Sequence, residues 1–285
     1  LLDQNGSEVL RERNYTPKDY KETIISIGNI VKNIEKKFNK KFSVGICHPG
    51  STINETGLIK NSNNSTWMNN KPFQKDISNE LNRIIYCEND ANCFALSEAI
   101  DGAANHYKIV FGVILGSGCG GGLVIDKKII SGSNGLSGEW GHNPLPYYGN
   151  LNDEDINLGE GTLVKNINIE KFISGKGLED LYFEKKNKKK STKEIFSDVL
   201  NNGKFINNFY NRLSRSLSIL VNTIDPDAII FGGGVSNEIK DLNLIKKMTA
   251  NFSGNLNIKT SFLKPKYGDA SGVRGAAILG RQNSI

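Results

Sequence analysis

Residues 109–122 read Ile109-Val110-Phe111-Gly112-Val113-Ile114-Leu115, then Gly116-Ser117-Gly118-Cys119-Gly120-Gly121-Gly122. The nearly continuous apolar run predicts a β-strand that is buried on both faces. The glycines that follow let the backbone turn sharply and bring several N–H groups toward one point. Such a turn binds phosphate oxygens, and the hydroxyl of Ser117 adds a donor. A glycine-rich β-turn without a ligand is the alternative.

A second strand ends in the same way. Ala228 to Phe231 is apolar and leads into Gly232-Gly233-Gly234. A flat glycine surface of this kind can receive a nucleotide base and ribose, although glycines that only let a helix pack on a strand are the alternative. Two corners of this type in one chain favour nucleotide binding more than either does alone.

A third strand, Ile84 to Cys87, ends in Glu88-Asn89-Asp90 and leads into a helix predicted from Ala91 to Ile100. An aspartate at this corner can take a proton from a hydroxyl while Asn89 holds a neighbouring hydroxyl. Phosphoryl transfer to an alcohol uses a base of this kind. The alternative is that Asn89 or Asp90 only caps the helix.

Further polar side chains follow in glycine-rich or loop segments. Glu139 and His142 are three residues apart, and Glu170 precedes the apolar pair Phe172-Ile173. A polyhydroxylated ligand needs several directional partners in one pocket, and these side chains supply them. A purely structural hydrogen bond is the alternative for His142.

The rest of the chain alternates strands and helices, which predicts an α/β fold. Asn5-Gly6 indicates a β-hairpin at the beginning of the sequence. Thr16 followed by Pro17 predicts the N-cap and first residue of an amphipathic helix. Ser43 to Cys47 is a short strand, and Val273 to Leu279 is the last helix.

Composition limits the classes of function. A length of 285 residues suits two domains of moderate size. The net charge of +6 is spread along the chain, and the run Lys185–Lys190 lacks interleaved aromatic residues, so we expect no nucleic-acid binding. The four cysteines form no C-x-x-C pair, and no apolar stretch reaches a membrane span of about 20 residues. We therefore expect a cytoplasmic protein with reduced thiols and no membrane contact.

These segments together resemble a known family. Leu115–Gly122 followed by Gly138–Pro146 resembles the signature region of ROK family sugar kinases, and Glu88–Cys93 resembles the catalytic segment of that family. Within the family, the sequence is most similar to the bacterial fructokinase (manno-fructokinase) branch at Pro49-Gly50-Ser51, Lys60-Asn61 and Asn64–Trp67. The N-acetylglucosamine kinases are the neighbouring branch. The resemblance covers nearly the whole chain.

The resemblance implies a two-domain actin-like ATPase (ribonuclease H-like) fold with ATP and sugar in the cleft between the domains. Residues 1–102 would form a small domain completed by a C-terminal helix at 272–285, and residues 103–271 a large domain. It also implies a homodimer. The implied reaction is ATP-dependent phosphorylation of a hexose, fructose to fructose 6-phosphate, with glucose or an N-acetylhexosamine as alternative substrates.

The resemblance also assigns roles to individual residues. Asp90 is the implied general base, and Mg²⁺ would bridge the phosphates of ATP. The residues implied to hold the sugar are Gly50, Asn61, Asn89, Glu139, His142 and Glu170. The residues implied to hold the nucleotide are Gly116, Ser117 and Gly118 at the phosphates and Gly232, Gly233 and Gly234 at the adenosine.

The sequence departs from the family pattern in two places. Family members begin with an Asp-x-Gly-Gly-Thr phosphate loop, and this chain starts at Leu1-Leu2-Asp3, so we expect a preceding segment. Members also carry three cysteines that bind zinc with the loop histidine, whereas Gly161, Leu163 and Asn168 stand here. His142 is the only retained ligand, and we expect no structural zinc. A sugar-sensing transcriptional regulator of the family, or a non-catalytic sugar-binding protein, remains an alternative.

Overall fold

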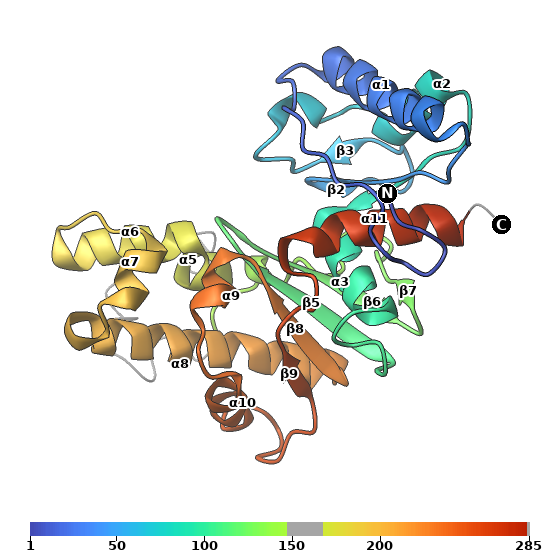
Figure 1. Ribbon diagram of the computed structural model, residues 1–285. Helices are drawn as coiled ribbons and strands as arrows, with labels where there is room; N and C mark the ends of the chain where they lie inside the picture. The colour runs from blue at the N-terminus through green and yellow to red at the C-terminus, as the bar shows by residue number, and fades with distance from the viewer. Residues whose placement is uncertain (147–167, 284–285) are drawn as a thin grey trace.

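The apolar run at 109–115 forms the central strand of the larger of two lobes (Figure 1). The computed structural model describes residues 1–146 and 168–283. The larger sheet has the order β7-β6-β5-β8-β9. Its strands are β5 (Ile109–Leu115), β6 (Cys119–Ile125), β7 (Lys128–Ile129), β8 (Ala228–Gly232) and β9 (Ser261–Leu263). Strands β5, β8 and β9 are parallel, and β6 and β7 are antiparallel to their neighbours.

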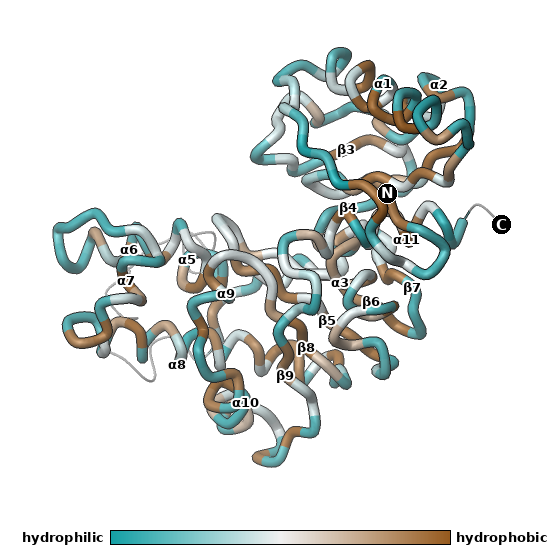
Figure 2. Tube along the Cα trace, viewed as in Figure 1, coloured by the Kyte–Doolittle hydropathy of each residue, from teal (hydrophilic) through white to brown (hydrophobic). Residues whose placement is uncertain are grey.

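Helices cover both faces of this sheet, which explains why β5 and β8 are apolar throughout (Figure 2). Successive side chains of a strand point to opposite faces. Phe111 and Val113 therefore join a core with α8 (Val199–Ile224), while Val110 packs with Phe94 and Leu96 of α3 (Asp90–Ile100). The helices of the larger lobe are α5 (Ile169–Ile173), α6 (Gly175–Lys186), α7 (Thr192–Ser197), α8 (Val199–Ile224), α9 (Gly234–Glu238) and α10 (Leu242–Ala250).

The smaller lobe contains two parallel strands and a short hairpin. The parallel strands β1 (Gly45–His48) and β4 (Tyr86–Asn89) pair with His48 opposite Asn89. The hairpin strands are β2 (Ser51–Thr52) and β3 (Ile59–Lys60). Helices α1 (Tyr20–Phe38) and α2 (Phe73–Leu81) and the short helix η1 (Thr66–Met68) enclose a separate core.

Two helices lie between the lobes: α3 (Asp90–Ile100) and α11 (Ser271–Gln282) (Figure 1). Helix α11 packs on α3 and on β1. The contact is close because glycine lies at the crossing: a Cβ at Gly275 would be 1.7 Å from the carbonyl oxygen of Cys93. The C-terminal helix thus joins the first strands of the smaller lobe, whereas the domain boundaries at residues 102 and 271 stay a prediction.

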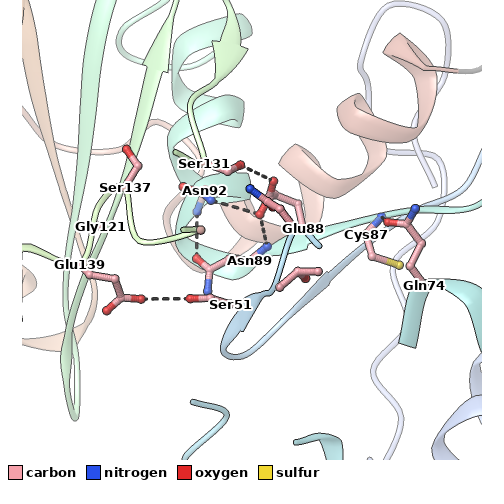
Figure 3. Close-up of a pocket in the computed structure, with 13 residues that line it drawn as sticks. Ser51, Gln74, Cys87, Glu88, Asn89, Asn92, Gly121, Ser131, Ser137 and Glu139 are labelled. Atoms are coloured by element: carbon pink, nitrogen blue, oxygen red, sulfur yellow. Dashed lines mark hydrogen bonds between the residues drawn. The ribbon is translucent and has the colours of Figure 1, made fainter. Parts of the chain in front are cut away.

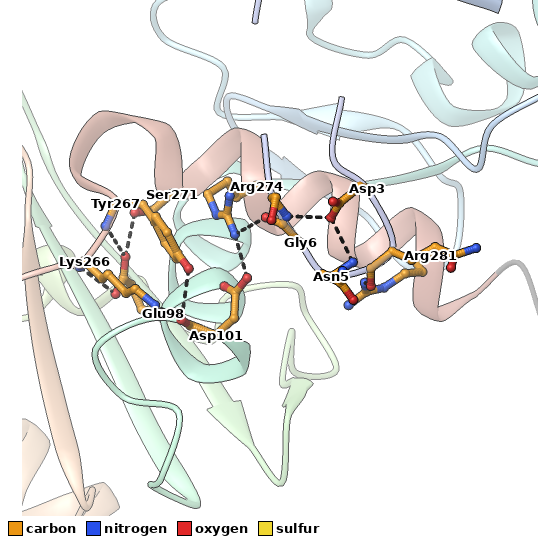
Figure 4. Close-up of polar contacts among 12 residues, drawn as sticks. Asp3, Asn5, Gly6, Glu98, Asp101, Lys266, Tyr267, Ser271, Arg274 and Arg281 are labelled. Atoms are coloured by element: carbon orange, nitrogen blue, oxygen red, sulfur yellow. Dashed lines mark hydrogen bonds and ion pairs between the residues drawn. The ribbon is translucent and has the colours of Figure 1, made fainter. Parts of the chain in front are cut away.

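The buried carboxylate of Glu98 fixes the beginning of α11 against the end of α3 (Figure 4). It accepts hydrogen bonds from Ser271 Oγ at 2.7 Å and from the backbone N–H groups of Lys266 at 3.0 Å and Ala103 at 2.8 Å. Arg274 of α11 also donates to Asp101 at 2.6 Å. These bonds satisfy a charge that would otherwise be costly to bury.

Most predicted elements form, with three corrections. The first helix is capped by Asp19, whose side chain accepts from the N–H of Glu22, rather than by Thr16. The Asn5-Gly6 turn closes an isolated bridge between Leu2 and Glu8 instead of a regular hairpin. The glycines from 120 to 122 belong to β6 and not to the turn. None of the helices in the described parts of the chain is long and apolar enough to cross a membrane.

Candidate active site

Asn89 and Asp90 stand at the junction of β4 and α3. Asn89 is the N-cap of α3: its Oδ1 accepts from the N–H groups of Ala91 at 2.9 Å and Asn92 at 3.2 Å. Its Nδ2 donates to the carbonyl oxygen of Gly50 at 2.9 Å. Asn89 therefore caps the helix, and because one amide hydrogen of this side chain remains for a ligand, the cap does not exclude sugar binding.

Asp90 is the first residue of α3, and its side chain is open to solvent. The protein around its inner side nevertheless raises the pKa of the carboxyl above the ordinary value. The backbone N–H of Ala91 lowers this pKa, and the charge of Glu139 raises it further. An accessible carboxylate with a raised pKa is a better proton acceptor than an ordinary one, as a general base requires.

A pocket of about 190 Å³ opens beside this corner and is lined from both lobes (Figure 3). Ser51 Oγ from the smaller lobe donates to Glu139 Oε1 from the larger lobe at 3.2 Å. The carboxylate of Glu88 accepts from Ser131 Oγ at 3.0 Å and from Asn92 Nδ2 at 3.1 Å. The wall is therefore rich in hydroxyl, amide and carboxylate groups, which suits a ligand with several hydroxyls.

At the rim of this pocket, hydrogen bonds connect the β2–β3 hairpin of the smaller lobe to the loop from 131 to 137 of the larger lobe. Asn54, in the β2–β3 hairpin, donates to the carbonyl oxygens of Gly132 and Ser133, each at 3.0 Å. Lys60 Nζ donates to the carbonyl oxygen of Asn134 at 2.9 Å. The loop from 131 to 137 thus lies over the hairpin and closes one side of the pocket.

The remaining residues predicted to hold the sugar do not line this pocket. His142 Nε2 is 3.4 Å from Glu139 Oε2, so the imidazole orients a lining residue. Glu170 Oε2 accepts from the N–H of Cys119 at 2.8 Å and lies against Gly118. Asn61 is exposed with a left-handed backbone, at φ 57°.

The two glycine corners lie side by side because β5 and β8 are parallel neighbours, with Ile114 opposite Gly232. Gly233 has φ +88°, and a Cβ there would be 2.4 Å from the carbonyl oxygen of Leu115, so only glycine fits. A Cβ at Gly116 or at Gly234 would meet nothing within 4 Å. The backbone is therefore open to the approach of a ligand at these two positions.

Metal ligation was tested on the side chains present. Across residues 1–146 and 168–283, no three His, Cys, Asp or Glu side chains gather in a way that could hold a metal ion. Asn168, at one of the family's cysteine positions, instead caps α5 by accepting from the N–H of Lys171 at 3.1 Å. Gly161 and Leu163 lie outside the described residues, so the expectation of no structural zinc stays a prediction.

Several residues that line the pocket were not predicted from the sequence as site residues, including Ser51, Glu88, Asn54 and Ser131. Glu88 directly precedes Asn89 and could have been noticed as a carboxylate at the same strand end. Ser131 and Asn54 carry no sequence signal, because each reaches the opposite lobe only in the folded chain, Ser131 at Glu88 and Asn54 at the carbonyl oxygens of Gly132 and Ser133.

Comparison with known proteins identifies the family. A family model described as ROK family matches residues 1–283. The chain belongs to the ROK family. Among curated ROK relatives, N-acetyl-D-glucosamine kinase from Mannheimia succiniciproducens is 37% identical over 276 residues, covering 94% of this chain and 90% of the relative. The enzyme of the same name from Histophilus somni is 38% identical over 275 residues, with the same coverage.

Solved ROK structures confirm the predicted two-domain actin-like fold. A ROK hexokinase from Thermus thermophilus has a TM-score of 0.78 at 21% identity, covering 94% of this chain and 88% of that structure. A ROK glucokinase from Streptomyces griseus, solved with glucose and AMPPNP, has a TM-score of 0.76 at 23% identity, covering 99% of this chain and 95% of that structure. The curated relatives above are N-acetyl-D-glucosamine kinases and not fructokinases, so the predicted family is confirmed and the resemblance to the fructokinase branch is not supported.

Proposed function

We propose that this protein is an ATP-dependent sugar kinase that phosphorylates an N-acetylhexosamine, with N-acetyl-D-glucosamine as the first candidate. The observation that carries the proposal is the accessible Asp90 carboxylate beside a polar pocket, in a chain 37% identical to an N-acetyl-D-glucosamine kinase. Fructose, the substrate expected from sequence alone, becomes the second candidate.

In this mechanism Asp90 accepts the proton of the attacking sugar hydroxyl. The hydroxyl oxygen forms a bond to the γ-phosphorus of ATP, the bond from that phosphorus to the β-phosphate oxygen breaks, and ADP leaves. Asn89 and Glu139 orient the sugar through the polar groups that face the pocket. The glycine turn from 116 to 118 and the corner from 232 to 234 hold the nucleotide, which can approach the backbone at Gly116 and Gly234, where a Cβ would meet nothing within 4 Å.

Mg²⁺ would supply charge neutralisation on the phosphates of ATP. Mg²⁺ usually binds through one or two carboxylates together with substrate phosphates. Among the described residues no three His, Cys, Asp or Glu side chains gather, so Mg²⁺ would be held mainly by the phosphates of ATP and by water, and Asp90 stays free to act as the base. The loop from 131 to 137, which closes one side of the pocket, would limit the access of water to the transferred phosphoryl group.

The test is a coupled assay of ADP release by the protein expressed from its full reading frame. The substrates are N-acetylglucosamine, N-acetylmannosamine, glucose, mannose and fructose, each titrated at saturating ATP. We expect kcat/KM for an N-acetylhexosamine to exceed that for fructose at least tenfold. A preference for fructose would overturn the proposed substrate class. Hexose binding measured by calorimetry without any ADP release would overturn the kinase assignment.

A further inference from the structure

His48 is an almost fully buried imidazole that the proposed mechanism does not use. It is 3% exposed and ends β1, directly opposite Asn89 in the sheet register. Its ring packs edge-on against Phe73, with the ring centroids 5.8 Å apart. A histidine that only filled this core would need no particular direction for its nitrogens, yet both nitrogens point to one short segment.

That segment is the turn from Pro49 to Thr52. His48 Nδ1 is 3.1 Å from the carbonyl oxygen of Pro49, and Nε2 is 3.4 Å from Thr52 Oγ1. A carbonyl oxygen only accepts, so Nδ1 carries the hydrogen. In the neutral ring Nε2 is then an acceptor and receives the hydroxyl hydrogen of Thr52. Burial lowers the pKa of the imidazole and so keeps the ring in this neutral form.

The same turn presents the sugar side of the pocket. The carbonyl oxygen of Gly50 receives Asn89 Nδ2 at 2.9 Å, and Ser51 Oγ donates to Glu139 at 3.2 Å. Ser51 and Thr52 also line the pocket. The turn has little freedom on its outer side, because a Cβ at Gly50 would be 2.4 Å from the carbonyl oxygen of Lys60. His48 is therefore the inner support of a segment that two candidate sugar-binding residues contact.

We propose that His48 is a positioning residue for the hexose: its two ring nitrogens hold the turn from Pro49 to Thr52 in the form that orients Asn89 and Glu139. This inference rests on the proposed function of the pocket. The nucleotide corners belong to the other lobe and have no contact with this turn among the described hydrogen bonds. Loss of the support should therefore weaken the sugar and leave the nucleotide unchanged.

The first test compares His48→Phe with the conservative His48→Asn. Phenylalanine keeps an aromatic ring against Phe73 but removes both hydrogen bonds, so we expect the KM of the sugar to rise about tenfold. The KM of ATP and kcat should stay within about threefold. Asparagine places an amide donor near the position of Nδ1, so His48→Asn should recover part of the loss. Thr52→Val should raise the sugar KM less than His48→Phe and add little to it in the double variant.

If His48 only stabilised the core, its replacement would lower stability without a selective effect on the sugar KM. A control variant in the same core shows what such a loss of stability does to KM. Ile77→Val removes one methylene from the same core without touching the turn, and should lower stability while leaving the sugar KM unchanged. Unfolding midpoints of all variants show which losses come from folding. An equal effect of His48→Phe on both substrates, or none on the sugar, overturns the inference.

Two further readouts separate this inference from the proposed function. Nitrogen NMR of the wild-type protein should show His48 as the neutral tautomer with hydrogen on Nδ1; hydrogen on Nε2 would overturn the inference. Calorimetry of sugar binding gives the affinity even without turnover. A wild-type protein that binds no hexose would overturn both proposals, whereas normal hexose binding by His48→Phe would overturn this one alone.

Discussion

Asp90 combines solvent access with a raised pKa, and the two properties come from different neighbours. Asp90 is not itself a lining residue of the pocket; its carboxylate is exposed on one side, while α3 and the end of β1 surround its inner side. A proton acceptor works best when its pKa is close to the working pH. Asp90 therefore has both the place at the strand end and the raised pKa that a general base requires.

Replacing this carboxylate should remove turnover and preserve binding. We expect Asp90→Asn to lower kcat by about 10² to 10⁴-fold, because the asparagine amide cannot accept the hydroxyl proton. Hexose affinity measured by calorimetry should change less than about threefold. Asp126→Asn is the matched control, because Asp126 is exposed in the turn between β6 and β7 at φ 49°, a conformation that asparagine tolerates. Retention of a tenth of kcat in Asp90→Asn would reject the assignment.

The raised pKa of Asp90 predicts the acid limb of activity. The base must be ionised, so kcat falls as the pH drops through its pKa, and a raised pKa moves this loss to a higher pH than for an ordinary carboxyl. The charge of Glu139 is one cause of the shift. Glu139→Gln should therefore move the acid limb of kcat, measured at saturating sugar, to lower pH. An unmoved limb would mean that another group controls it.

At the scale of the elements, sequence patterns predicted those helices and strands whose limits depend on neighbouring residues of the chain. The apolar run predicted β5 with its observed limits, and the helix predicted from Ala91 to Ile100 forms as α3 with one residue more at its start. The glycines from 120 to 122 were expected in the turn, yet they form part of β6. A Cβ at Gly122 would be 2.6 Å from the carbonyl oxygen of Ala91, so this glycine serves the approach of α3. That approach is a tertiary contact, which no local pattern reveals.

The residues of the candidate site also fall into two groups, those that could be predicted from the sequence and those that could not. Asp90 and the glycine corners follow strands directly, so their place at strand ends could be predicted from sequence. His48 could not, because its role depends on the pairing of β1 with β4 and on the path of the next four residues. A single histidine among three in the sequence carries no spacing signal.

The packing of α3 and α11 gives a stability prediction at this scale. Gly275→Ala would place a methyl group on the carbonyl oxygen of Cys93, and we expect a loss of about 1–3 kcal/mol in the free energy of unfolding. Gly203→Ala in α8 is the control, because a Cβ there meets nothing within 4 Å. This change should be neutral or stabilise by up to about 1 kcal/mol. Urea unfolding of both variants measures the difference, and equal stability would mean that the helices can separate at little cost.

At the scale of the whole molecule, the chain is tied across its lobes in two different ways. Glu98 fixes α11 to α3 through buried hydrogen bonds, as Figure 4 shows. The contacts of Asn54 and Lys60 with the loop from 131 to 137 are instead exposed or half-exposed and use backbone carbonyls. Buried bonds to a charge cost more to break than exposed bonds, so the rim of the pocket is where the lobes can separate most easily.

Weakening this rim should let the sugar leave faster without affecting the chemistry. In Asn54→Ala combined with Lys60→Ala, the loss of three exposed hydrogen bonds should raise the sugar dissociation rate by about three- to tenfold, with a similar rise in KM. The KM of ATP should not change, because both residues lie far along the chain from the glycine corners and on the opposite lobe. Glu55→Ala, at the exposed tip of the same hairpin, is the matched control. Stopped-flow displacement of bound sugar measures the rate directly, and an unchanged rate in the double variant would mean that the sugar escapes by another side of the pocket.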